Sequence, residues 1–221
     1  MRRREFQMED SQTIRDFLLE MSFGFLATHR DEYPGITPIN FVFTDVALAP
    51  SEESRLPSPT GALYFHGSRI GQKMRDLQRN PRASFAVARE FALIPSYFTD
   101  PELACPATAF FKSVILRGTL NEVEDLEHKR LVLEEFMRKL QPEGGYLPFD
   151  LNHKEYRKNI KGVSLVRLMP TAITAKFKFG QNRGGKEREL TIQGLENRNR
   201  SGDRETLLEM QRCPYHREAQ K

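Results

Sequence analysis

The chain has 221 residues, 38% of them hydrophobic and 29% charged, so it can bury the core of one domain with appendages. The formal net charge is only +4, which argues against nucleic-acid binding. Cys105 and Cys213 are too few for a disulfide framework or a thiolate metal site, so we expect no metal and a cytoplasmic setting. We find no signal peptide and no apolar run of membrane length, and expect no membrane partner.

The N-terminal part predicts one helix followed by short strands. Apolar residues from Ile14 to Met21 recur at helical spacing after Ser11, which we expect to cap the helix. Five segments rich in aromatic and β-branched residues, separated by Gly, Pro, Asn and Asp, then predict strands. These segments are residues 23–28, 35–44, 62–66, 83–88 and 107–123.

The C-terminal part predicts a second amphipathic helix over residues 125–140 and two further strands over 163–169 and 172–179. Many short strands with few helices are typical of an antiparallel barrel, so we expect a mainly β fold, a β-barrel with a few flanking helices. Beyond Gly180 the chain becomes polar, with a short terminal helix near residues 206–210. We therefore expect a barrel domain over residues 1–180 and an appendage over 181–221.

Two loops differ in composition. Residues 49–61 combine three prolines with serines and glutamates, which is typical of a surface excursion. Residues 91–106 are rich in aromatic and aliphatic side chains among prolines. A loop this apolar covers either the edge of a core or a flat ligand, and the residues leave both readings open.

Residues 63–73, which read LYFHGSRIGQK, join a predicted strand to a predicted helix. Gly67 and Gly71 let the backbone turn sharply or approach a bound group closely. Amides at a helix start and the charge of Lys73 both favour a phosphate. The residues alone also allow a plain connection in which Arg69 and Lys73 are solvated.

Other motifs of known chemistry are incomplete or absent in this sequence. Residues 180–186 have the spacing of a nucleotide-binding P-loop, but Glu187 stands where a Ser or Thr hydroxyl should reach Mg²⁺. The five histidines form no pair at metal-ligand spacing, and Cys213 with His216 is a solitary pair. No nucleophile elbow of the Gly-x-Ser-x-Gly type supports hydrolase chemistry.

Four pieces of the chain follow one another in an order that carries a resemblance. They are residues 38–43 (PINFVF), 63–67 (LYFHG) with the following Gly71 and Lys73, Asn80-Pro81 before a strand, and 112–114 (KSV) leading to Gly118. Over about residues 5–180 the chain resembles the flavin-binding split-barrel proteins related to pyridoxamine 5′-phosphate oxidase, and within them the nitroimidazole-resistance (Nim-like) branch.

The resemblance implies a split β-barrel of the FMN-binding type that forms a homodimer with the flavin, FMN or FAD, at the subunit interface. It implies that the isoalloxazine ring contacts Ile39, Asn40 and Phe41, and that Ser113 adds a polar contact. The phosphate side would be surrounded by His66, Gly67, Ser68, Gly71 and Lys73. His66 is the candidate catalytic residue, as a proton donor, because the unperturbed pKa of histidine lies near physiological pH.

The leading function is therefore a flavin-dependent oxidoreductase acting on a small-molecule electron donor and acceptor. The arginine–lysine phosphate pair of pyridoxamine 5′-phosphate oxidase itself is represented here by Gln72-Lys73, and its arginine-rich C-terminal strand has no counterpart, so we do not expect vitamin B6 phosphate as the substrate. Two alternatives stay open. One is a non-catalytic flavin-binding or flavin-sensing protein, and the other is a haem-handling relative with His66 as an axial ligand.

Overall fold

The computed structural model describes residues 3–212, so the Cys213 and His216 pair lies outside the described residues. These described residues are built around eight strands. They are β1 (Gln7–Met8), β2 (Phe23–Thr28), β3 (Gly35–Asn40), β4 (Val42–Thr44), β5 (Ala62–Gly67), β6 (Arg82–Ile94), β7 (Thr108–Val123) and β8 (Ser164–Lys178).

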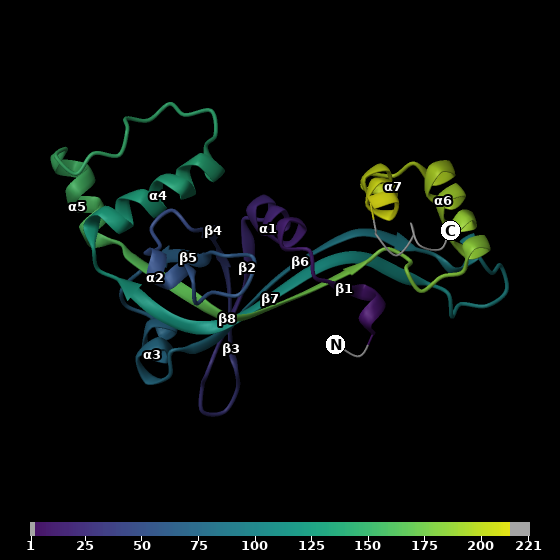
Figure 1. Cartoon of the computed structure of the whole chain (residues 1–221), viewed down its shortest axis with the longest axis horizontal. Coiled ribbons are helices and arrows are strands. Elements are labelled where there is room, and N and C mark those ends of the chain that lie inside the picture. Colours follow the sequence, from purple (N-terminus) through teal and green to yellow (C-terminus); the bar gives the residue numbers. More distant parts are fainter. Residues whose placement is uncertain (1–2, 213–221) are drawn as a thin grey trace. The chain divides into compact units, whose positions relative to one another are not determined.

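These strands form one sheet in the order β3-β2-β6-β7-β8-β5-β4, with β1 pairing with β8 (Figure 1). β2 runs antiparallel to both β3 and β6, and β5 runs antiparallel to both β4 and β8. The predicted mainly β fold is confirmed. The helices are α1 (Ser11–Glu20), α2 (Pro50–Glu53), α3 (Gln72–Arg79), α4 (Leu126–Leu140), α5 (Lys154–Gly162), α6 (Gly185–Arg198) and α7 (Asp203–Arg212), with short 3-10 turns at Arg4–Phe6 and Ser96–Phe98.

The chain divides into two compact units. Within the described residues, the barrel unit comprises residues 10–87 and 114–174, and the terminal unit comprises 3–9, 88–113 and 175–212. The domain boundary predicted at residue 180 stays a prediction. No helix among residues 3–212 has the length and apolar character needed to cross a bilayer.

Several predicted boundaries are corrected by the structure. The cap of α1 is Asp10, whose carboxylate accepts the Thr13 amide at 2.7 Å, so Ser11 is the first helical residue instead. The strand expected over residues 35–44 is interrupted at Phe41, so that β3 pairs with β2 whereas β4 pairs with β5. The two strands expected after residue 163 are a single strand, β8, which passes through a buried Pro170.

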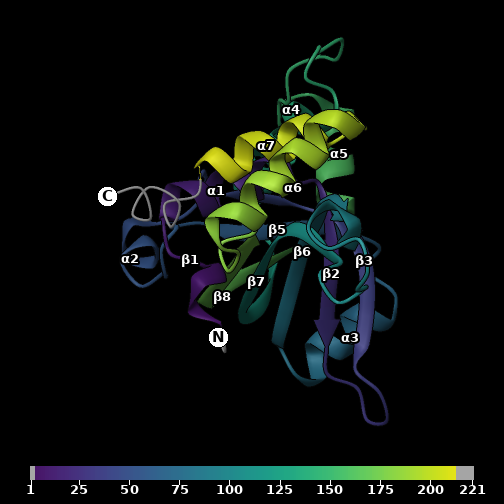
Figure 2. The same ribbon diagram turned by 90° about the vertical axis from the view of Figure 1, so that its right-hand side faces the viewer.

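The terminal unit gives the polar C-terminal segment a definite fold. Figures 1 and 2 show α6 and α7 side by side, and the Arg198 guanidinium joins them through the Asp203 carboxylate at 2.5 Å. Lys112 on β7 pairs with Glu209 on α7 at 2.8 Å, so α7 is attached to the sheet of its own unit. The apolar segment predicted as a loop over residues 91–106 begins within a strand, because residues 91–94 belong to β6. The Phe91 ring is buried with its centroid 5.2 Å from that of Phe179, which favours the reading as a core edge for this part.

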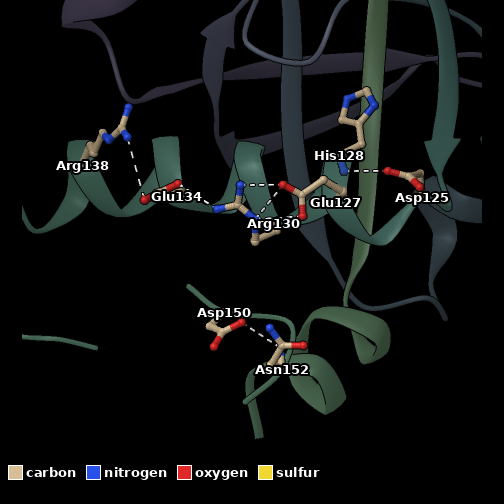
Figure 3. Close-up of polar contacts among 8 residues, drawn as sticks. All are labelled: Asp125, Glu127, His128, Arg130, Glu134, Arg138, Asp150 and Asn152. Carbon is tan, nitrogen blue, oxygen red and sulfur yellow. Dashed lines mark hydrogen bonds and ion pairs between the residues drawn. The ribbon is translucent and has the colours of Figure 1, made fainter. Parts of the chain in front are cut away.

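In the barrel unit, α4 packs on β4 and α5. Its inner face buries Val132 and Phe136. The outer face carries a ladder of ion pairs from Glu127 to Arg138, and Figure 3 shows it running along one side of the helix. Asp125 caps the helix by accepting the His128 amide at 2.7 Å. The amphipathic pattern thus determines which face of α4 meets the sheet.

A buried polar network lies under β5. The Tyr64 hydroxyl is 3.0 Å from His128 Nε2, and burial raises the pKa of Tyr64 to about 12. Arg167 on β8 pairs with Glu52 on α2 at 3.1 Å, so the segment predicted as a surface excursion contains a helical turn tied to the sheet. β5 is thereby held from several sides just before it reaches His66.

The carboxylate of Asp76 anchors α3 to the end of β2. It is 1% exposed and accepts hydrogen bonds from Thr28 Oγ1 at 2.7 Å, Arg30 Nε at 2.8 Å and Gln72 Nε2 at 2.6 Å. Burial alone would raise the pKa of Asp76, but the bonds from Arg30, Thr28 and Gln72 together lower it below its ordinary value.

We expect Asp76→Asn to lower the free energy of unfolding by about 2–3 kcal/mol at pH 7, because bonds to a buried charge are lost. Because the pKa of Asp76 is lower in the folded protein, the ionised carboxylate stabilises the folded state at pH values above the unfolded pKa of 3.8. This stabilisation is lost as the pH falls through the folded-state pKa. The gap between wild type and variant in urea denaturation should therefore close below about pH 4. Asp31→Asn, at an exposed carboxylate paired with Arg79, is the matched control and should change stability little. A gap that stays constant to pH 2 would contradict this account.

Candidate functional site

Two of the predicted site segments meet at one end of the β4–β5 pair. Val42 on β4 pairs with Tyr64 on β5 in antiparallel register. β3, which ends at Asn40, also contacts β5, the strand that carries His66. The Asn40 side chain donates to the Ser22 carbonyl at 3.2 Å and stays exposed.

One turn of α4 contacts both segments. The Phe136 ring lies edge-on to the His66 ring, with centroids 4.9 Å apart. Lys139, three residues further along α4, places its Nζ 4.9 Å from the centroid of the Phe41 ring. The helix therefore supports the strand end that carries Asn40 and the strand end that carries His66.

Lys73 folds back over the loop that precedes its helix. A Cβ added to Gly67 would lie 2.6 Å from Lys73 Nζ, so the ammonium occupies the space that any larger residue at position 67 would fill. The glycine and the cation thus form a compact positively charged feature at the end of β5. Charge-assisted hydrogen bonds from such a group suit a phosphate.

The N-terminus of α3 is open beside this feature. Gly71 precedes the helix at φ +153°, a conformation that side chains rarely adopt, and no heavy atom lies within 4 Å of where its Cβ would be. No side chain among the described residues caps the helix at Gly71, so its first amides are left for water or a ligand. Ser68 accepts the Ile70 amide at 3.1 Å, and Arg69 donates to the Lys161 carbonyl at 2.9 Å. These two bonds shape the loop between the glycines.

The local electrostatics favour neutral His66 in the unliganded protein. Partial burial lowers the pKa of His66, and the nearby Lys73 charge lowers it further. An anion bound between Lys73 and His66 would raise the pKa of His66, since it would stabilise the charged imidazolium.

Lys139 is a candidate that sequence reasoning missed. Its ammonium donates to the Met21 carbonyl and lies over Phe41, and burial lowers its pKa to about 8. A lysine in the last turn of a surface helix normally caps the helix, and nothing in the local pattern distinguishes this one. Only the packing of α4 against the β3–β4 junction shows its position.

A cleft of about 420 Å³ lies next to the glycine loop and shares Arg69 with it. Its lining also includes Lys129, which is 2% exposed and donates to the Val163 carbonyl at 2.9 Å. Burial, and then the Arg69 charge, lower the pKa of Lys129. The glutamates Glu122 and Glu124 line the same cleft, so its charge is mixed.

The predicted site residues are therefore only partly grouped. Residues 39–41 and 66–73 come together in the barrel unit, with Ile39 half-buried and Phe41 buried. Ser113 lies in the part of β7 that belongs to the terminal unit, and its role stays a prediction. Among residues 3–212, no cluster of three His, Cys, Asp or Glu side chains is placed to hold a metal ion.

Comparison with protein-family models gives one match. The model described as pyridoxamine 5′-phosphate oxidase matches residues 10–177 of the chain. None of the curated proteins matches the chain significantly.

Solved structures share the fold. A candidate 5-nitroimidazole antibiotic resistance protein from Bacteroides thetaiotaomicron superposes with a TM-score of 0.57 at 21% identity, over 77% of this chain and 85% of that chain. The flavocytochrome Anf3 from Azotobacter vinelandii gives 0.57 at 17% identity, over 78% and 69% of the two chains. An FAD and haem binding protein from Mycobacterium smegmatis gives 0.56 at 17% identity, over 78% and 73%. The predicted split-barrel fold is confirmed.

We expect the His66 pKa, followed by NMR titration of the imidazole, to lie below 6.5 in the unliganded protein. Lys73→Gln should raise it, because the neighbouring positive charge is removed. Lys158→Gln, at an exposed position on α5, removes the same charge elsewhere and should leave it unchanged. An identical His66 pKa in wild type and Lys73→Gln would contradict the proximity of the two groups.

Proposed function

The chain belongs to the pyridoxamine 5′-phosphate oxidase family, and we propose that it binds FMN and acts as a flavin-dependent oxidoreductase on a small-molecule electron donor and acceptor. Fold alone does not determine chemistry, so the proposal is based on the site. The observation that carries it is the Lys73 ammonium lying against Gly67 at the open N-terminus of α3.

The residues present suit the phosphate of a flavin. A cation, free helix amides and a glycine that leaves room for both make an anion cradle at residues 67–73. In the proposal, Lys73 and the first amides of α3 hold the phosphate, while Ser68 keeps the loop in shape through its bond to the Ile70 amide. A bound flavin supplies the electron transfer, and the protein positions it and its substrate.

The ring side of the proposed site lies on an exposed apolar face. Phe23 pairs with Asn40 across β2 and β3, and Phe25 pairs with Pro38, so these four side chains share one face of the sheet. Phe23 and Phe25 are 47% and 46% exposed, and Ile36 on the same strand pair is 65% exposed. Contiguous exposed apolar surface of this kind marks an interaction site. We propose that a second copy of the chain covers this face and encloses the flavin ring next to Asn40.

His66 is proposed to hold a proton beside the cofactor. In the unliganded site its neutral form is favoured by burial and by Lys73. A phosphate bound next to Lys73 would reverse this effect, so flavin binding should be accompanied by proton uptake at His66.

The absorption spectrum of the freshly purified protein is the first test. We expect a two-banded flavin spectrum, with FMN recovered by chromatography after denaturation. Recovery of FAD would support the flavin site but identify the cofactor as FAD instead of FMN. An intense Soret band would favour the haem alternative. A protein that stays colourless after incubation with both flavins would overturn the proposal. Reduced flavin that is not reoxidised by any acceptor tested would favour a non-catalytic flavin-binding role.

Lys73→Gln should weaken FMN binding by about 10- to 150-fold, because a hydrogen bond to a charged group is worth about 1.5–3 kcal/mol. Gly67→Ala should weaken it too, since the new Cβ pushes the flexible Lys73 ammonium away without disturbing the core. Gly162→Ala adds the same methyl group where no heavy atom lies within 4 Å, and should leave binding unchanged. Fluorescence titration of FMN measures all three. Equal affinity in Lys73→Gln and Gly162→Ala would place the phosphate elsewhere.

Phe25→Lys should convert a dimer, of twice the 25.6 kDa chain mass, into a monomer in size-exclusion chromatography with light scattering. The charge would be buried without a partner in the proposed interface. Leu147→Lys, at a 64% exposed position outside this face, is the matched control and should stay dimeric. A monomeric wild type, or a Phe25→Lys dimer of unchanged stability, would contradict the proposed interface.

A further inference from the structure

A second pocket of the barrel unit has none of the residues of the glycine loop in its lining. It has a volume of about 530 Å³ and lies where β2, β6 and β7 approach the start of β3. A volume of this size accommodates a small organic molecule rather than an inorganic ion alone.

The charge of this pocket has a single sign. Arg30, Arg82 and Arg117 line it, together with His29, and its lining includes no carboxylate. Arg30 follows the end of β2, Arg82 begins β6 and Arg117 lies within β7, so no local sequence motif contains them. A concave surface lined by one sign of charge concentrates its field and attracts the opposite charge.

The arginines differ in how far their charge is compensated. Arg30 is held in place by its ion pair with Asp76 at 2.8 Å. Arg82 donates to the neutral Asn80 amide oxygen at 3.3 Å, and within residues 3–212 neither Arg82 nor Arg117 forms an ion pair with a carboxylate. Two arginines without a carboxylate partner therefore line one pocket next to a third whose charge is paired.

The pocket also offers neutral donors. Its lining includes the hydroxyls of Ser84 and Thr119, which lie on the same strands as Arg82 and Arg117. Thr28 and Thr171 line it as well, but their hydroxyls already donate to Asp76 and to the Arg117 carbonyl. Planar guanidinium forks with hydroxyls beside them match the geometry of carboxylate and phosphate oxygens.

We propose that this pocket binds a small organic anion carrying at least two negative charges, as phosphate or carboxylate groups. Arg82 and Arg117 supply the principal bonds, and Arg30 is a positioned third cation. Asp76 is nearly fully buried behind Arg30 and orients it without entering the pocket lining. The pocket shares no residue with the glycine loop, although Arg30 and Gln72 of that loop bond the same Asp76 carboxylate.

Isothermal titration of the full chain with pyrophosphate and, separately, with citrate tests the proposal at constant ionic strength. We expect saturable binding of at least one probe, and the stronger probe distinguishes a phosphate ligand from a carboxylate ligand. Arg82→Gln and Arg117→Gln should each weaken binding at least tenfold while thermal unfolding changes little, because both side chains are exposed. Arg138→Gln removes the same charge from the exposed face of α4 and is the matched control.

The remaining outcomes overturn the proposal. They are the absence of saturable binding for both probes, affinities unchanged in Arg82→Gln and Arg117→Gln, and an equal loss in Arg138→Gln, which would indicate a general charge effect. Loss of binding in Lys73→Gln with retention in both arginine variants would assign the anion to the glycine loop. Flavin content, read from absorbance in every variant, separates this result from a failure of the proposed flavin site.

Discussion

The buried carboxylate of Asp76 is the constraint on which the candidate site depends. It bonds simultaneously to Thr28 at the end of β2, to Arg30 just beyond it, and to Gln72 at the start of α3. Because a buried charge is costly unless every bond is made, the orientation of α3 is fixed by the sheet rather than by the loop that precedes it. Lys73, the next residue after Gln72, is thereby aimed back at Gly67.

The site is then assembled by strand pairing. β3 and β4 both contact β5, and α4 packs against Phe41 through Lys139 and against His66 through Phe136. The polar network of Tyr64 and His128 beneath β5 limits the movement of the strand that presents His66. Rigid elements thus position the groups, while the glycine loop supplies the space and the charge.

Local patterns account for most of what could be predicted. The aromatic strand β2 and the amphipathic helix α4 were located within a residue because their side chains alternate or recur at one period. α5 and α6 were missed because α5 buries only Ile160, and α6 buries only Thr191 and Leu195, too few for a visible apolar stripe. The glycine loop was visible because it is contiguous. The position of Lys139 and the arginine pocket were not, since both depend on contacts between segments far apart in the sequence.

Pro38 lies in the edge strand β3 and affects how that strand can pair with another chain. β3 terminates the strand order, and an open strand edge is a template on which another chain can add in a fibril-like manner. Pro38 has no amide hydrogen to offer such a strand, which is why proline is tolerated at sheet edges. The same residue faces outward beside Phe25, so the chain can present an apolar surface for face-to-face association while resisting polymerisation along its edge. Replacing it with a β-branched residue would leave that surface intact but remove a safeguard against aggregation.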